Sequence, residues 1–150
     1  MVPCVADPTL GFLVADVGRL IRQRFEAALS GVDCGLTAAE ARTLNMVRQL
    51  PDQRQSVLAA ILGIEPMTLV GHLDRLEQAG LICRETDPQD RRAKIVVLGE
   101  AAQSVLAKID EALLQVRAEI SHGMTPEETA AAVRVLLQVR SNLAAAADRA

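Results

Sequence analysis

The most constraining feature of this sequence is a change of hydrophobic period near its middle. Apolar residues recur at helical spacing around residues 57–62 and again over 66–79, and Gly63 lies between the two segments. The period then shortens to that of strands over residues 81–86 and 93–98. Two short helices joined by a tight turn and followed directly by a β-hairpin are the order of a winged helix-turn-helix. The sequence therefore predicts this unit.

Each short helix is expected to bury one apolar face. In the second helix, Pro66 suits the first turn, and three leucines spaced at i, i+4 and i+7 face the core. These leucines are Leu69, Leu73 and Leu76. In the first helix, a single face is expected to hold Val57, Leu58, Ile61 and Leu62.

Longer helical patterns lie on both sides of this unit. One spans about Leu10 to Leu29, and another is opened by a capping box at Thr37 and Glu40. After Gly99 two more helices follow, and Thr125-Pro126-Glu127-Glu128 opens the last one. Half of the residues are apolar and neither Trp nor Tyr occurs, which favours packed helices over a β-sandwich. The expected fold is mainly α with an α+β winged helix, in one domain of residues 1–150.

Composition and motifs argue against several classes of function. The net charge of −3 does not indicate nucleic-acid binding, so any positive charge for DNA must be local. No apolar run approaches the about 18 residues that span a membrane, and the N-terminus does not resemble a signal peptide, so a cytoplasmic protein is expected. The three cysteines, Cys4, Cys34 and Cys83, form no CxxC motif and only two His occur, so neither a metal site nor a cofactor is expected. No phosphate loop, GxSxG or HExxH motif is present, and we do not expect an enzyme.

The second short helix and the hairpin carry the residues expected to contact DNA. Opposite its leucines the helix presents a polar stripe in which Thr68 suits a base contact in the major groove. The segment from Arg84 to Lys94 concentrates positive charge, and its two adjacent arginines are expected at the hairpin turn, where one can enter the minor groove. Asp90 is expected to hold one of these guanidinium groups in a bidentate pair. The expected DNA-binding residues are Pro66, Met67, Thr68, Gly71, His72, Arg75, Asp90, Arg91, Arg92 and Lys94.

Three motifs in this region resemble the MarR family of bacterial transcriptional regulators. They are Leu62-Gly-Ile-Glu-Pro66, Leu73-Asp-Arg-Leu-Glu-Gln-Ala-Gly-Leu-Ile82 and Asp90-Arg-Arg-Ala-Lys94, and the last is the most specific. The similarity is closest to the SlyA branch. It implies a homodimer on a palindromic duplex site, with intertwined helices at about residues 8–36 and 99–148 and a DNA-binding lobe at about 37–98. It also implies that Thr68 enters the major groove, that Arg91 or Arg92 enters the minor groove, and that the protein is cytoplasmic, on the nucleoid when DNA-bound.

The resemblance further implies regulation by an effector. Family members often release DNA when a small aromatic carboxylate or phenol binds, so a ligand-responsive repressor is the leading interpretation. Arg19 or Arg22 in the first helix would meet the carboxylate of the ligand. Other members respond to oxidation of a cysteine, for which the candidate is Cys83 beside Arg84.

Two positions depart from the family pattern. Gly71 stands where members of this branch commonly carry Arg, and a good Arg–guanine contact gives about 1–3 kcal/mol of discrimination. Gly99 stands where the family usually has a capping Thr, and glycine is a tolerable cap. Because of Gly71 and the acidic net charge, an alternative stays open: a helical interaction protein whose winged-helix lobe has lost DNA recognition.

Overall fold

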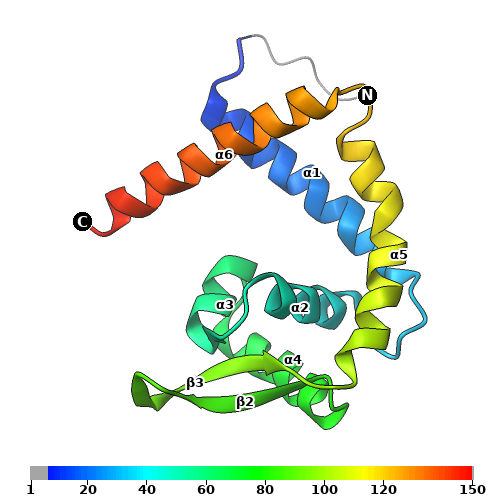
Figure 1. The fold of residues 1–150 in the computed structure, drawn as a ribbon, viewed down its shortest axis with the longest axis vertical. Helices are drawn as coiled ribbons and strands as arrows, with labels where there is room; N and C mark the ends of the chain where they lie inside the picture. The colour runs from blue at the N-terminus through cyan, green and yellow to red at the C-terminus, as the bar shows by residue number, and fades with distance from the viewer. Residues whose placement is uncertain (1–6, 150) are drawn as a thin grey trace. The chain divides into compact units, whose positions relative to one another are not determined.

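The computed structural model describes residues 7–149, so Cys4 lies outside the described part. Its main elements are six helices and a small antiparallel sheet, which confirms the predicted mainly helical winged-helix fold (Figure 1). Along the chain they are α1 (Leu10–Ser30), α2 (Ala38–Gln49), β1 (Gln53–Arg54), α3 (Gln55–Leu62), α4 (Pro66–Gln78), β2 (Ile82–Asp87), β3 (Asp90–Leu98), α5 (Ala102–Ile120) and α6 (Pro126–Ala147).

The chain divides into two compact units, one up to Val116 and one from Arg117 on. The first unit contains the winged helix-turn-helix together with α1 and most of α5. The second contains the end of α5 and the whole of α6.

Local sequence signals set the helix boundaries as predicted. Thr37 Oγ1 accepts a hydrogen bond from Glu40 N at 3.2 Å, and Glu40 Oε2 accepts one from Thr37 N at 2.9 Å, which completes the capping box. Gly63 ends α3 in the left-handed conformation with φ 66°, a conformation that suits glycine. Pro66 occupies the first turn of α4, where its missing N–H removes no helical hydrogen bond.

The sheet has one strand more than the sequence predicts. Its order is β1-β3-β2, and the two-residue strand β1 pairs Gln53 with Val96 and Arg54 with Ile95. A strand of two residues shows no period in the sequence, so only its partner across the sheet defines it. As a result, the start of α3 is tied directly to the wing.

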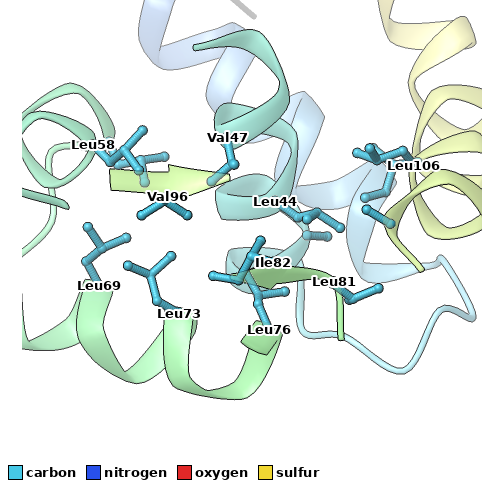
Figure 2. Packing of buried hydrophobic residues seen from close by; sticks show 14 of the residues in the cluster. Leu44, Val47, Leu58, Leu69, Leu73, Leu76, Leu81, Ile82, Val96 and Leu106 are labelled. Atoms are coloured by element: carbon cyan, nitrogen blue, oxygen red, sulfur yellow. The ribbon is translucent and has the colours of Figure 1, made fainter. Parts of the chain in front are cut away.

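The core lies where the helices of the lobe meet the sheet. Figure 2 shows Leu58, Leu69 and Leu73 gathered around Val96 of β3, all of them almost fully buried. The apolar face of α3 is only partly buried, because Val57 and Ile61 remain 38% and 46% exposed. The buried face of this short helix is narrower and consists of Leu58, Ala59 and Leu62.

Arg48 and Asp110 join the lobe to α5. The guanidinium of Arg48 contacts both carboxylate oxygens of Asp110, with Nη1–Oδ2 at 2.6 Å and Nη2–Oδ1 at 2.8 Å. Two parallel charge-assisted bonds fix orientation as well as distance. This pair therefore holds α2 in a defined position along α5.

Gly99 is required by close packing and is more than a tolerable cap. A Cβ placed on Gly99 would lie 2.3 Å from the carbonyl oxygen of Gly80, and Gly99 N donates to Leu81 O at 2.8 Å. The end of β3 thus passes against the residues that follow α4 with no room for a side chain. Helix α5 itself begins later, at Ala102.

Helices α1 and α6 leave large apolar side chains exposed. In α1, Leu10 is 55% exposed and Val17 48% exposed, while no residue of α6 is buried and Leu143 is 67% exposed. No single helix within residues 7–149 has the length and hydropathy needed to span a bilayer, and the pair that does so jointly, α3 with α4, is bent by 112°.

Candidate nucleic-acid interface

Helix α4 presents a polar stripe to solvent because its leucines anchor the opposite face. Leu69, Leu73 and Leu76 are each 1% exposed or less. The expected DNA-facing positions lie away from them: Pro66, Met67, Thr68, Gly71 and Arg75 are exposed, and His72 is half-buried. A Cβ on Gly71 would meet nothing within 4 Å, so this stripe has space for a larger side chain.

Two residues of the stripe are held by α2. Arg75 Nε lies 2.9 Å from Oε1 of Glu40, whose carboxylate is 3% exposed and also completes the cap of α2. His72 Nδ1 lies 3.1 Å from Oγ1 of Thr43, a residue that is 1% exposed. No local pattern of residues predicts either contact, because the partners are 35 and 29 residues apart. Helix α2 thus orients side chains of α4 as well as packing against it.

The wing turns earlier than predicted. Asp87 pairs with Asp90, so the turn itself is Pro88-Gln89, and Arg91 and Arg92 follow it as part of β3. The prediction that the two arginines lie at the hairpin turn is therefore corrected. Asp87 Oδ1 accepts a hydrogen bond from Gln89 N at 2.8 Å, which closes the turn over the Asp-Pro sequence.

A bulge carries both arginines. Thr86 pairs with Lys94 and the next residue, Asp87, pairs with Asp90, so residues 91–93 of β3 have no opposite residue on β2. A bulge of this kind bends a strand and redirects its side chains. Arg91 and Arg92 are exposed, and within residues 7–149 the structure gives neither of them an ion pair. Lys94 beside them donates to Thr86 Oγ1 at 3.0 Å.

Asp90 holds a different arginine from the one expected. Its Oδ2 lies 3.6 Å from Nη1 of Arg54, and its Oδ1 accepts a hydrogen bond from the backbone N of Arg92 at 3.0 Å. The predicted bidentate pair with the side chain of Arg91 or Arg92 is therefore wrong. The reason is strand β1, which the sequence did not predict. It pairs Arg54 with Ile95 of β3, and so brings the Arg54 side chain beside the wing.

Arg54 joins both ends of the turn. Its Nε lies 2.7 Å from Oδ2 of Asp87, which is 8% exposed. The hydrogen bond from Gln89 N and the guanidinium of Arg54 lower the pKa of Asp87 below its ordinary value. A cavity of about 480 Å³ lies beside this pair, between Arg54, Val57 and Gln89.

Arg84 does not belong to the positive surface of the wing. Its Nη2 contacts Asp74 Oδ1 at 2.6 Å, its Nη1 lies 3.6 Å from Glu77 Oε2, and its side chain is only 20% exposed. Arg84 instead ties β2 to α4. The positive charge available to a ligand in this region is therefore smaller than a count over residues 84–94 suggests.

The candidate effector arginines lie on the exposed side of α1. Arg19 Nη2 pairs with Asp16 Oδ1 at 2.6 Å, and its Nη1 donates to Gln23 at 3.3 Å. Arg22 is exposed. Neither arginine lines the cavity beside Arg54.

The surroundings of Cys83 do not favour a thiolate. Desolvation and the carboxylates of Glu85 and Glu77 raise the pKa of this exposed thiol, whose Sγ lies 3.9 Å from Glu85 Oε1. Reactive cysteines lie near positive charge, which lowers the pKa of the thiol. Within residues 7–149, no three His, Cys, Asp or Glu side chains come together as a metal site.

These features define the class of the protein. A helix-turn-helix whose second helix has an exposed polar stripe, followed by a wing with exposed arginines, is a winged helix-turn-helix of the transcription-regulator type. A family model described as "MarR family" matches residues 36–94. The transcriptional regulator PA3341 is 34% identical, with 90% of this chain and 98% of that chain covered and a TM-score of 0.70. The chain belongs to the MarR family.

Two further solved structures share the fold. The transcriptional repressor CouR, bound to a 23-mer DNA duplex, is 24% identical with 88% of this chain and 92% of that chain covered and a TM-score of 0.63. BpsR of Bordetella bronchiseptica, whose DNA binding is regulated by 6-hydroxynicotinic acid, is 22% identical with 92% and 97% covered and a TM-score of 0.63.

Proposed function

We propose that this protein is a non-enzymatic repressor that binds a palindromic DNA duplex as a homodimer through α4 and the wing. The observation that carries the proposal is the pairing of an exposed polar stripe on α4 with two arginines that a bulge leaves exposed beyond the wing turn. Such a helix reads base edges in the major groove, and such a wing reaches the adjacent backbone or minor groove. The repressor CouR, seen on duplex DNA, supports the same use of the fold here.

Each part of the surface has a different role. The exposed start of α4, from Pro66 to Thr68, approaches base edges, and Thr68 supplies a hydroxyl and a methyl group. Arg91 or Arg92 enters the minor groove, and Lys94 contacts the backbone. Asp90 supports this surface, since it accepts a hydrogen bond from the backbone N of Arg92 and pairs with Arg54.

The dimer in this proposal uses the terminal helices, at about residues 8–36 and 99–148. Their exposed apolar residues, among them Leu10, Val17 and Leu137, would be removed from water, at about 25 cal/mol per Å² of apolar surface buried. A two-fold axis then repeats the DNA-binding lobe of residues 37–98. The two copies of α4 enter successive major grooves roughly 10–11 bp apart, so the preferred site is a palindrome.

The effector in this proposal is a small aromatic carboxylate or phenol, and the branch of the family is the SlyA-like one. Regulation of BpsR by 6-hydroxynicotinic acid supports this ligand chemistry. Arg22 is the better of the two candidate arginines on α1, because Arg19 is already paired with Asp16. A regulator of this kind acts in the bacterial cytoplasm, where the DNA is. Redox sensing by Cys83 is the weaker proposal, because carboxylates surround the thiol.

The test is fluorescence anisotropy of the full-length protein on the intergenic duplex upstream of its own gene, at two salt concentrations. A scrambled duplex of equal length is the control. Binding that is tighter on the native duplex at both salt concentrations supports the proposal. Equal binding to both duplexes favours the alternative motivated by Gly71, an interaction protein whose lobe has lost DNA recognition.

A further inference from the structure

A buried hydroxyl group on α2 lies beside the ring of His72 on α4. Thr43 Oγ1 donates a hydrogen bond to the carbonyl oxygen of Ala39 at 2.9 Å. The same oxygen lies 3.1 Å from Nδ1 of His72 on α4. Thr43 is 1% exposed, so water does not provide it with alternative partners.

These two contacts favour one assignment of the imidazole proton. A hydroxyl has one proton, and if that proton pointed at His72, two acceptor oxygens would face each other at 2.9 Å. The proton of Thr43 is therefore directed to Ala39, and a lone pair of Oγ1 faces the ring. For this contact to be a hydrogen bond, Nδ1 of His72 must be the donor. A neutral imidazole has only one N–H group, so Nε2 is then an acceptor.

The acceptor lies at the edge of the ring that faces away from α2. His72 is half-buried, and it lies one turn from Thr68 and three residues before Arg75, on the stripe that faces solvent. The two neighbouring polar side chains differ from it: the Thr68 hydroxyl can donate or accept, and Arg75 can only donate and is paired through Nε with Glu40. His72 is thus the residue of the stripe that can act as donor or acceptor in principle and whose role is set by a contact with another helix.

We propose that Thr43 fixes His72 as an acceptor that reads an exocyclic amino group in the major groove, and so selects adenine or cytosine at one position of each half-site. The inference rests on the proposed DNA-binding function. In the major groove adenine presents N6–H₂ and cytosine presents N4–H₂, whereas guanine presents only the acceptors N7 and O6. An acceptor at Nε2 therefore pairs with the first two bases and opposes guanine. Thr43 is a positioning residue and His72 is the specificity-determining residue.

The experiment is a binding selection from random duplexes with full-length wild type and four variants. His72→Asn keeps a polar group near the Nδ1 position, where it still reaches Thr43, but has no group at Nε2. His72→Gln places an amide near the Nε2 position, and Gln pairs with adenine through N6 and N7. Thr43→Val removes the hydroxyl at nearly constant shape, and Thr43→Ser is its matched control because it keeps the hydroxyl.

The expected profiles differ at one symmetric position of the palindrome. Wild type and Thr43→Ser prefer adenine or cytosine over guanine there by roughly tenfold per half-site. His72→Asn keeps the palindrome but shows no preference at that position, and His72→Gln narrows the preference to adenine. Thr43→Val admits guanine, because nothing then prevents Nε2 from carrying the proton. Guanine selected there by wild type, or a profile unchanged in His72→Asn, would overturn the inference.

A second measurement needs no DNA. Nitrogen-15 chemical shifts of the His72 ring, measured in the free protein at a pH where the imidazole is neutral, distinguish a protonated Nδ1 from a protonated Nε2. We expect a protonated Nδ1 in wild type and in Thr43→Ser, and a loss of this assignment in Thr43→Val. A protonated Nε2 in wild type would overturn the inference whatever the duplexes show. Failure of wild type to select any palindrome would instead overturn the proposed function.

Discussion

Arg54 Nε lies 2.7 Å from Asp87 Oδ2, and this contact joins the strand that precedes α3 to the turn of the wing. The same guanidinium approaches Asp90 on the other side of the turn, at 3.6 Å. The arginine therefore spans the two residues between which the hairpin reverses.

Asp87→Asn should lower stability in a pH-dependent way. Because the folded state lowers the pKa of Asp87, the unfolded state binds more protons as the pH falls through the ordinary aspartate value of about 3.9. The stabilisation is thus fully present above that value and is lost as the pH falls through the folded pKa. Urea unfolding should show the variant less stable at pH 7, with the difference from wild type shrinking below about pH 4. Asp52→Asn, at another residue that lines the cavity, is the control; a pH-independent difference for Asp87→Asn would contradict the expectation.

Arg91→Ala and Arg92→Ala should weaken DNA binding to different extents. Loss of a side chain that contacts only phosphate should reduce the slope of log binding constant against log salt concentration. The expected reduction is about 0.9 per lost contact, and twice that in a dimer. Loss of the side chain that enters the minor groove should also reduce the preference of the protein for sequences with a narrow minor groove. Anisotropy titrations over a salt series measure both, with Arg149→Ala as a control for net charge. If both variants keep the wild-type affinity and slope, the wing is not at the DNA.

Gly99→Ala and Gly71→Ala should change stability in opposite directions. At Gly99 the new Cβ would lie 2.3 Å from Gly80 O, and overpacking of this kind costs about 1–3 kcal/mol. At Gly71 the methyl group meets nothing, and replacing a helical glycine by alanine stabilises by about 0.5–1 kcal/mol. Chemical denaturation of the two variants beside wild type measures both effects. Equal effects at the two positions would show that the contact with Gly80 is not as close as described.

Leu137→Glu should convert the proposed dimer to a monomer. Leu137 is 58% exposed in the single chain, so the substitution does not disturb a core, but a carboxylate would be buried in the proposed interface. Light scattering coupled to size exclusion measures the mass. Met67→Glu is the matched control, because Met67 is 78% exposed and lies on the DNA-facing stripe instead. A Leu137→Glu protein that remains dimeric would place the interface elsewhere.

Gly71→Arg should strengthen DNA binding. The position has room for the side chain, the helix gains a better helix former, and each half-site gains a positive charge. A binding selection should also show guanine at the newly reached position, since Arg pairs with its O6 and N7. Gly71→Gln, similar in length but uncharged, separates the contribution of charge. Weaker binding by Gly71→Arg than by Gly71→Gln would contradict the proposed orientation of α4.

The sequence predicted what depends on local spacing. Leucines at i, i+4 and i+7 placed the buried face of α4, and Thr37 with Glu40 placed the start of α2. These signals are local because helix geometry repeats every few residues. The family motifs then predicted a hairpin after α4 and an exposed polar stripe on α4.

What the sequence could not predict depends on contacts between distant residues. Strand β1 is too short to show a period, and so its arginine was not expected beside Asp87 and Asp90. The contact between Thr43 and His72 could not be predicted either, because it forms only when α4 packs against α2. Which part of the apolar face of α3 is buried also depends on distant residues, since the neighbours that cover a side chain come from other elements.

The bulge at residues 91–93 separates a part of β3 where the chain can change in length from a part where it cannot. The pairs from Ile82↔Leu98 to Thr86↔Lys94 keep one continuous register, and they contain the residues of β3 that pack in the core. The three bulged residues lie outside that register, so a residue can be gained or lost there without moving any core side chain to the opposite face of the sheet. An insertion or deletion in this segment can therefore change how far Arg91 and Arg92 extend from the sheet while the packing of Ile95 and Val96 stays the same.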